Sequence, residues 1–124
     1  MYELKIISQF AAAHRLREYE GGCENLHGHN WKVEVHVAGE DVQENGLLVD
    51  FRLVKDATRR ALDELDHTYL NELEAFKVVN PSSENIARYL FRVLSKDLNT
   101  ATVRVARVTA WESDTACASY TEPG

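Results

Sequence analysis

Two stretches in which apolar and polar side chains alternate constrain the fold of this chain most. In residues 2–12 the even positions carry Tyr2, Leu4, Ile6 and Phe10, and in residues 31–37 the large apolar side chains occupy odd positions. A period of two is typical of a strand that buries one face and exposes the other. A charged segment with two adjacent glycines, residues 15–26, separates the two stretches and is interpreted as a loop. The pattern therefore predicts two strands joined by this loop.

Two further segments repeat apolar residues at the period of an α-helix. Residues 52–65 carry leucine, valine and alanine on one side, which predicts an amphipathic helix of about four turns. A second helix is predicted after Pro81, where Ser82 or Ser83 can cap the first turn. Capping alone can account for these two serines.

The C-terminal part returns to strand-forming sequence. Residues 102–111 are rich in β-branched side chains, and a short strand is predicted near residues 116–121. The order ββααββ predicts an α+β fold, with both helices on one face of an antiparallel four-stranded sheet. No linker or internal repeat divides the chain, so residues 1–124 are predicted to form a single domain. Because such a sheet leaves two open edges, we also expect a homo-oligomer.

Composition narrows the class of protein. A chain of 124 residues with 44% hydrophobic residues is large enough to bury a core without staples. Its formal net charge of -6 argues against a broad surface for nucleic acid or for an anionic membrane. The first residues lack the features of a secretory signal, and no apolar run approaches the roughly 20 residues of a membrane helix. We therefore expect a cytoplasmic protein in which the two cysteines do not form a disulfide framework.

Three histidines carry the strongest chemical signal. His27 and His29 are two positions apart and share one face if the second strand begins there. His14 ends the first strand, and an antiparallel hairpin would bring it beside them. Burying three imidazoles without partners is unfavourable, whereas coordination of Zn²⁺ by neutral nitrogens offsets the cost. We therefore predict that His14, His27 and His29 bind zinc and leave a fourth position open. The plainer alternative is a chance His-x-His pair on a solvated strand end.

Cys23 leaves two alternatives. It can serve as a fourth ligand, which would close the site and make the metal purely structural. It can instead remain a free thiol whose pKa is lowered by the nearby cation, and then exchange protons near neutral pH. We favour the free thiol because a chain of this size does not need a zinc staple.

The ordered set of segments FAAAHRL, CENLHGHNWKVEV, GLLVDF, LDHTYLN, PSSENIARYLF and a late strand ending in WES resembles a known family. The resemblance is to the 6-pyruvoyl-tetrahydropterin synthase family, most closely to its bacterial 6-carboxy-tetrahydropterin synthase branch, and it covers nearly the whole chain. It implies the tunnelling fold, in which ββααββ subunits join as trimers into a β-barrel and two barrels stack into a hexamer.

The resemblance also implies roles for individual residues. It implies zinc ligation by the three histidines and proton transfer by Cys23. It further implies that Asp66 and His67 form an acid–base couple that acts across a subunit interface. Glu112, with Ser82 and Ser83, would hold the pterin ring. A carboxylate suits this anchoring role because it can accept two N–H bonds from the pterin edge. Without the resemblance, Asp66 and His67 would be interpreted as ordinary residues at the end of a helix, and Glu112 as an ordinary charged residue at the end of a strand.

The implied activity is that of a zinc-dependent carbon–carbon lyase. It would convert 7,8-dihydroneopterin triphosphate into 6-carboxy-5,6,7,8-tetrahydropterin, with release of acetaldehyde and triphosphate, in queuosine biosynthesis. One alternative is triphosphate elimination to the pyruvoyl pterin, although the short spacer between Cys23 and His27 favours the carboxy enzyme. Another is a non-catalytic, zinc-stabilised binding module. Lys32, Arg15 and Arg17 are candidate partners for the triphosphate.

Overall fold

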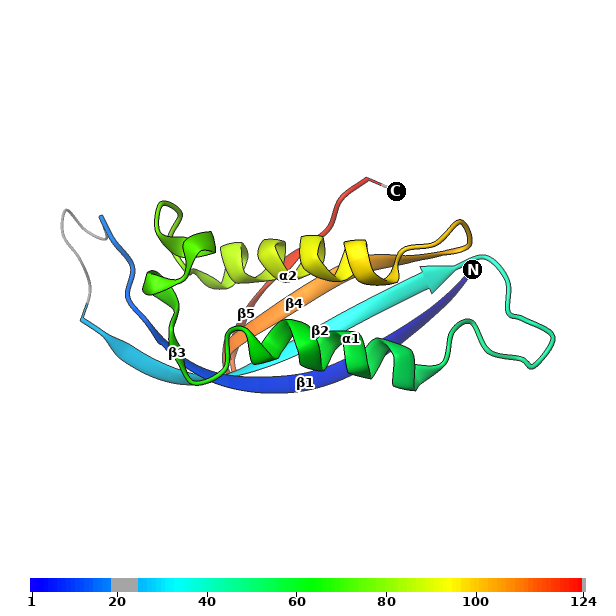
Figure 1. The fold of residues 1–124 in the computed structure, drawn as a ribbon, viewed down its shortest axis with the longest axis horizontal. Coiled ribbons are helices and arrows are strands. Elements are labelled where there is room, and N and C mark those ends of the chain that lie inside the picture. The colour runs from blue at the N-terminus through cyan, green and yellow to red at the C-terminus, as the bar shows by residue number, and fades with distance from the viewer. Residues whose placement is uncertain (19–24, 124) are drawn as a thin grey trace.

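Five strands form one sheet in the part of the chain that the structure describes, and two helices cover one side of it (Figure 1). The computed structural model describes residues 1–18 and 25–123. The order across the sheet is β3-β1-β2-β4-β5. The strands are β1 (Tyr2–His14), β2 (His27–Gly39), β3 (Thr68–Tyr69), β4 (Val103–Ser113) and β5 (Ala116–Tyr120), and the helices are α1 (Phe51–Asp63) and α2 (Ser83–Leu98).

The short strand β3 corrects the predicted sheet. It pairs in parallel with β1, Ala12 opposite Thr68 and Ala13 opposite Tyr69, so the sheet is mixed and not a four-stranded antiparallel one. A strand of two residues is too short to show a period of two, and its pairing is set by the connection from α1 to α2. The four predicted strands and two predicted helices are present in the predicted order.

Capping residues explain where the helices begin. The Asp50 carboxylate accepts a hydrogen bond from the backbone N–H of Arg52 at 2.9 Å at the start of α1. Ser82 does the same for α2, where its Oγ accepts from the backbone N–H of Asn85 at 3.2 Å. Each cap satisfies one of the amides that the first turn of a helix leaves without a partner. Ser82 is therefore used in capping, as the sequence allows.

The core lies between the sheet and the helices. Even positions of β1 and odd positions of β2 face it, so Phe10, Trp31 and Val33 are buried against α2 residues such as Ile86 and Leu90. Helix α2 lies over β4 and β5, and α1 lies over β1. At one end of the molecule the same inward register continues from apolar residues to histidines, and it thereby places the candidate site.

The opposite face of the sheet carries a polar network. Glu34 lies 3.2 Å from the Lys5 Nζ and accepts a hydrogen bond from the Trp111 Nε1–H at 2.5 Å. This indole N–H is the main reason why the pKa of Glu34 lies below its usual value, and Lys5 adds to the effect. The Lys32 ammonium lies 4.5 Å from the centre of the Trp111 ring. A set of connected polar contacts thus lies on the face that the helices leave open.

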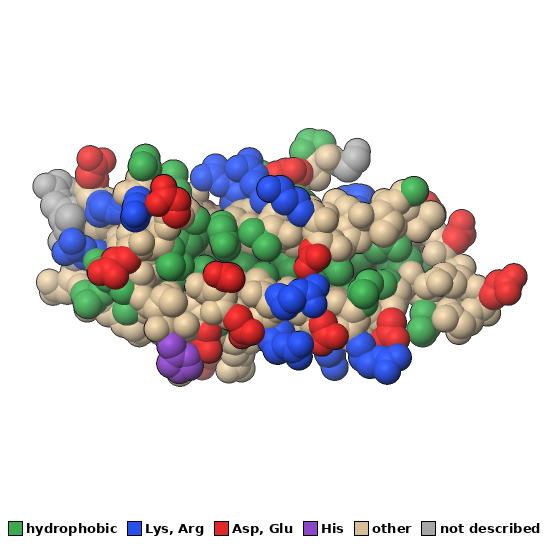
Figure 2. All heavy atoms as spheres, in the orientation of Figure 1, with side chains coloured by type: hydrophobic (Ala, Val, Ile, Leu, Met, Phe, Trp, Pro, Cys, Tyr) green, Lys and Arg blue, Asp and Glu red, His purple; other side chains and the backbone are tan. Residues whose placement is uncertain are grey.

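Charges of both signs share the surface. On the face seen in Figure 2, Lys and Arg side chains lie among Asp and Glu side chains. Among the described residues, the helices are all too short or too polar to span a membrane.

Candidate metal centre

The structure brings the three predicted ligands together at one end of the sheet. His14 pairs directly with His27 across β1 and β2, and His29 lies opposite Ala12, one inward position further along. The ring centroids of His14 and His27 are 4.6 Å apart, those of His14 and His29 5.2 Å, and those of His27 and His29 4.6 Å. His14 is buried, whereas the other two are partly exposed. The small side chain of Ala12 leaves room for the His29 ring.

Backbone carbonyl groups orient two of these imidazoles. The Nδ1 of His14 lies 2.7 Å from the carbonyl oxygen of Pro81, and the Nδ1 of His27 lies 2.8 Å from that of Asn25. Because a carbonyl can only accept, each Nδ1 must carry a proton, and in the neutral imidazole the lone pair is then on Nε2. The Nε2 of His14 is buried and has no hydrogen-bond partner among the described residues. This arrangement is typical of histidines that bind a metal through Nε2.

Glu112, at the end of β4, joins the cluster. Its Oε1 lies 3.1 Å from the Nε2 of His29 and 3.9 Å from the Nε2 of His27. The structure thus places this carboxylate beside the predicted metal ligands, a position that sequence reasoning did not predict.

The four side chains fit a zinc ion. One ligating atom from each of His14, His27, His29 and Glu112 lies within 4.8 Å of all the others. Donors at about 2.0–2.2 Å in a tetrahedral arrangement would lie about 3.3–3.6 Å from one another, so small shifts suffice. The buried Nε2 of His14 also gains the partner that it lacks. Three imidazoles and one carboxylate oxygen form a donor set that zinc commonly accepts.

Asp66 and His67 form a hydrogen-bonded pair outside this cluster. The Asp66 Oδ2 lies 2.9 Å from the His67 Nδ1, and its Oδ1 accepts from the backbone N–H of Ala11 at 2.8 Å. The Ala11 amide is the main reason why the pKa of Asp66 lies below its usual value, and the His67 side chain also lowers it. The His67 side chain is 82% exposed. The pair is therefore fixed in geometry but faces outward from its own chain.

His67 adopts an unusual backbone conformation. Its φ of 57° lies in the left-handed region, and its backbone N–H donates to the carbonyl of Ala11 at 2.6 Å. A non-glycine residue in this region is uncommon and costs conformational energy. The turn bends the chain so that neighbouring side chains, which diverge on a helix, meet in a hydrogen bond.

The other predicted site residues, Ser82, Ser83 and Cys23, are not among the residues that the structure places in the cluster. Ser83 is buried in the first turn of α2, and Ser82 follows Pro81, the residue that binds His14. Cys23 lies outside the described residues. Gly28, between the two histidines of β2, is exposed, and a Cβ added there would meet no atom of the described residues within 4 Å.

The candidate partners of the triphosphate separate clearly. The Arg17 guanidinium donates to backbone carbonyls of Phe76, Lys77 and Val79, so it is engaged within the chain. Lys32 projects from the face opposite to the histidines, over Trp111. Arg15 remains exposed next to His14.

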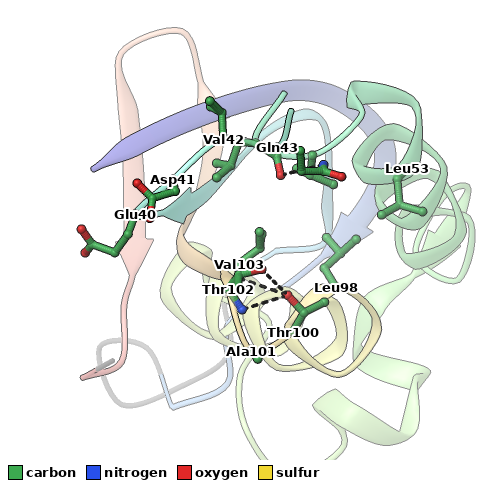
Figure 3. A pocket seen from close by; sticks show the side chains of 12 residues that line it. Glu40, Asp41, Val42, Gln43, Leu53, Leu98, Thr100, Ala101, Thr102 and Val103 are labelled. Carbon is green, nitrogen blue, oxygen red and sulfur yellow. Dashed lines mark hydrogen bonds between the residues drawn. The ribbon is translucent and has the colours of Figure 1, made fainter. Parts of the chain in front are cut away.

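A cavity of about 560 Å³ lies at the other end of the same elements (Figure 3). It is bounded by the end of β2, the ends of α1 and α2 that lie away from the histidines, and the start of β4. Leu53 and Leu98 face it together with Glu40 and Asp41, and Thr100 forms its hydrogen bonds to Thr102 and Val103 there.

Comparison with known proteins agrees over nearly the whole chain. A family model described as 6-pyruvoyl tetrahydropterin synthase matches residues 3–123. A protein of Archaeoglobus fulgidus, provisionally named a 6-carboxy-5,6,7,8-tetrahydropterin synthase, is 41% identical over 102 residues, which cover 82% of this chain and 84% of the relative. The dihydroneopterin monophosphate aldolase of Pyrococcus furiosus is 35% identical over 107 residues, 86% of each chain.

A solved structure supports the same assignment. The 6-pyruvoyl tetrahydropterin synthase of Caenorhabditis elegans superposes with a TM-score of 0.87 at 26% identity, and the match covers 98% of this chain and 96% of the other. The similarity includes the whole sheet and both helices, which hold the histidine cluster. The chain belongs to the 6-pyruvoyl tetrahydropterin synthase family.

Proposed function

We propose that this chain is a zinc-dependent pterin synthase in which His14, His27 and His29 hold the ion. The observation that carries the proposal is the convergence of these three side chains, with the Nε2 of His14 buried and directed away from Pro81. When bound, zinc would supply Lewis-acid polarisation of the hydroxyl groups on the substrate's side chain.

The proposed reaction is cleavage of 7,8-dihydroneopterin triphosphate with consumption of water. The products would be 6-carboxy-5,6,7,8-tetrahydropterin, acetaldehyde and triphosphate, as in queuosine biosynthesis. Two observations support this choice of product. The spacer between Cys23 and His27 has only three residues, and the relative from Archaeoglobus fulgidus carries the name of the carboxy enzyme.

The proton-transfer roles fall to Cys23 and His67. Asp66 holds the Nδ1 of His67 at 2.9 Å, which leaves Nε2 as the atom that exchanges a proton with substrate. The pKa of Asp66 lies below its usual value, so its carboxylate is charged near neutral pH and orients the His67 ring through Nδ1. His67 is exposed and is not part of the metal cluster of its own chain, so we propose that it serves the centre of a neighbouring subunit.

This arrangement requires a homo-oligomer, and we propose a trimer or hexamer. The outer edge of β1 supports it, because among the described residues β3 covers this edge only at Ala12 and Ala13. An uncovered edge offers backbone groups to a further strand. Light scattering of the purified protein measures the assembly directly, and a monomer at working concentration would contradict the proposal.

Glu112 is proposed to anchor the pterin ring, with Ser82 and Ser83 nearby. Its carboxylate could accept two hydrogen bonds from the N–H edge of the ring. The 3.1 Å separation from His29 gives it a second candidate partner, the ion itself. If Glu112 anchors the pterin, its substitution should weaken substrate binding and leave metal affinity unchanged. If it binds the ion, its substitution should weaken metal binding instead.

A second candidate function within the family is an aldolase reaction on the monophosphate. It is favoured by the identity of 35% to the enzyme of Pyrococcus furiosus that carries this name. Such a reaction would break the bond between the first and second side-chain carbons and release a two-carbon aldehyde that keeps its phosphate. It eliminates no triphosphate, so its products differ from those of the carboxy enzyme.

Mass spectrometry of the products tests these alternatives. The zinc-loaded protein is incubated separately with dihydroneopterin triphosphate and with the monophosphate. We expect acetaldehyde and the 6-carboxy pterin from the triphosphate. A pyruvoyl pterin without aldehyde would favour simple elimination, and a phosphorylated aldehyde from the monophosphate would favour the aldolase. If neither substrate reacts and Cys23→Ala both loses metal and unfolds, the chain is a zinc-stabilised module.

A further inference from the structure

A pair of hydrogen bonds fixes the chain just beyond β1. The backbone N–H of Arg17 donates to the Asn80 Oδ1 at 2.8 Å, and the Asn80 Nδ2 donates to the carbonyl of Arg17 at 2.9 Å. One side-chain amide thus satisfies both backbone groups of a single residue, as a neighbouring strand would. We call this pair the Arg17–Asn80 clasp.

The Arg17 side chain ties down the residues that precede Asn80. Its guanidinium donates to the carbonyl of Phe76, to that of Lys77 at 2.9 Å and to that of Val79 at 3.4 Å. A planar guanidinium with five N–H donors can reach several carbonyls at once, which a lysine ammonium on its flexible stem does less well. The carbonyl of Asn80 also accepts from the Asn85 Nδ2 at 2.9 Å, which links the clasp to α2.

The next residue, Pro81, orients a metal ligand. Its carbonyl accepts from the Nδ1 of His14 at 2.7 Å. Residues 77–82 form neither helix nor strand; Lys77, Val78 and Val79 in this segment are exposed, whereas Pro81 itself is buried. The burial of Pro81 and the polar contacts made by its neighbours therefore set the direction of its carbonyl together.

We propose that Arg17 and Asn80 are positioning residues for the metal centre. They hold residues 76–81 so that the Pro81 carbonyl keeps the His14 proton on Nδ1 and directs Nε2 toward the ion. The inference rests on the proposed function, because it assigns His14 to a bound metal. It gives Arg17 a task within its own chain, distinct from binding triphosphate.

Asn71 provides a matched control. It makes the same pair of bonds to Arg15, with the backbone N–H donating to Oδ1 at 3.0 Å and Nδ2 donating to the carbonyl at 2.9 Å. Asn71 does not precede the carbonyl that binds His14. Asn71→Ala and Asn80→Ala therefore remove equivalent hydrogen bonds from the same connection, and only the second should disturb the His14 ring.

The first measurement is zinc affinity of the full-length protein, by competition with a chromophoric chelator. We expect Asn80→Ala to weaken zinc binding about 10-fold or more, as loss of ligand support typically does. Arg17→Lys, which keeps the charge but loses the planar guanidinium donors, should also weaken zinc binding. Asn71→Ala should stay within about twofold of the unchanged protein. Thermal unfolding of each zinc-free variant reports any general loss of stability.

The second measurement needs no metal. Long-range proton–nitrogen spectra report which ring nitrogen of His14 carries the proton. We expect the Nδ1–H form in the unchanged protein and in Asn71→Ala, and a mixture of both forms in Asn80→Ala. A role limited to stability would lower the melting temperature without changing this ratio.

The outcomes separate this inference from the proposed function. If the unchanged protein binds zinc and Asn80→Ala leaves both zinc affinity and the His14 proton unchanged, the positioning role is wrong while the metal site stands. If the unchanged protein binds no zinc but keeps the Nδ1–H form, which Asn80→Ala loses, the proposed function fails and the clasp still orients His14. If both asparagine variants weaken zinc binding equally, the effect is general and the specific role of Asn80 is contradicted.

Discussion

The two ends of the sheet differ in what they offer a ligand. At the end away from the histidines lies a cavity of about 560 Å³, with leucine and valine side chains on its wall and two exposed acids at its rim. The histidine end gathers four potential metal ligands within 4.8 Å of one another. A large hollow is usually the first place to look for a site. Here the convergent donors lie at the other end, and the proposed chemistry is placed with them rather than in the cavity.

The same elements build both ends, so the difference comes from a few side chains. Strands β1 and β2 keep one inward register from Ile6 and Val35 to His14 and His27. At the cavity end that register meets aliphatic side chains on the helices. At the histidine end it meets the backbone carbonyl of Pro81, which favours imidazole over an apolar group. The first two substitutions below should change zinc binding or catalysis, and the next two should change stability.

His14→Ala should have the largest effect. It removes a buried side chain that is proposed to bind zinc and leaves the Pro81 carbonyl without its donor, so we expect zinc affinity to fall roughly 1,000-fold and turnover to disappear. His36→Ala is the control, because His36 pairs with Glu3 on the polar face at 3.0 Å. Chelator competition and turnover assays measure both. Equal losses in the two variants would remove the distinction between the histidine cluster and the rest of the sheet.

Glu112→Gln should rank second. In its proposed role as pterin anchor, Glu112 would accept N–H bonds that an amide cannot fully replace, so we expect KM to rise about 10- to 100-fold with zinc affinity nearly unchanged. Glu40→Gln, at the rim of the cavity, should alter neither quantity. A loss of zinc affinity in Glu112→Gln, with KM unchanged, would instead make the carboxylate a metal ligand.

Asp66→Asn should change the pH dependence of stability. The pKa of Asp66 lies below its usual 3.8 in the folded chain, so its charged form stabilises the fold above that pH. The stabilisation is lost as pH falls through the lowered folded pKa. We therefore expect the metal-free protein to lose unfolding free energy more steeply than Asp66→Asn as pH falls from about 5 to about 3. Denaturant titrations across this range measure it, and parallel curves would contradict the assignment.

Gly39→Ala should affect stability and leave turnover of the folded protein intact. An added Cβ would lie 2.6 Å from the Leu48 Cδ1 and 2.7 Å from the carbonyl oxygen of Thr102, at the cavity end. Because the second contact is with backbone, we expect a loss of about 1–3 kcal/mol in unfolding free energy. Denaturant unfolding and turnover measured together show whether the two ends are independent. A drop in turnover of the folded variant would show that they are coupled.

Much of the fold and of the cluster could be predicted because both depend on side-chain period. The register of Phe10 and Trp31 carries on to His14 and His29, so parity alone placed the histidines on the buried face. The same parity could have excluded Lys32, which falls in the outward register of β2. Only β3 was missed among the strands, since two residues carry no period.

The supporting contacts could not be predicted in the same way. Pro81 and Asn25 act through backbone carbonyls, which every residue possesses and no sequence pattern marks. Glu112 keeps the inward parity of Val108 and Ala110 on β4, but the pairing of β4 with β2, which brings it beside His29, is marked by no sequence pattern. Asn80 looks like an ordinary loop residue until its distance from Arg17 is known.

The open space around Gly28 makes this position a probe for contact with another molecule. Unlike Gly39, this glycine has no atom of residues 1–18 or 25–123 near enough to collide with an extra methyl group, so this part of the subunit gives no steric reason for it. If Gly28→Ala leaves folding unchanged but reduces assembly or turnover, the added methyl group must clash with a second subunit or with the substrate. Such a result would show that another molecule comes within the radius of one methyl group of the outer surface of β2, behind the imidazoles.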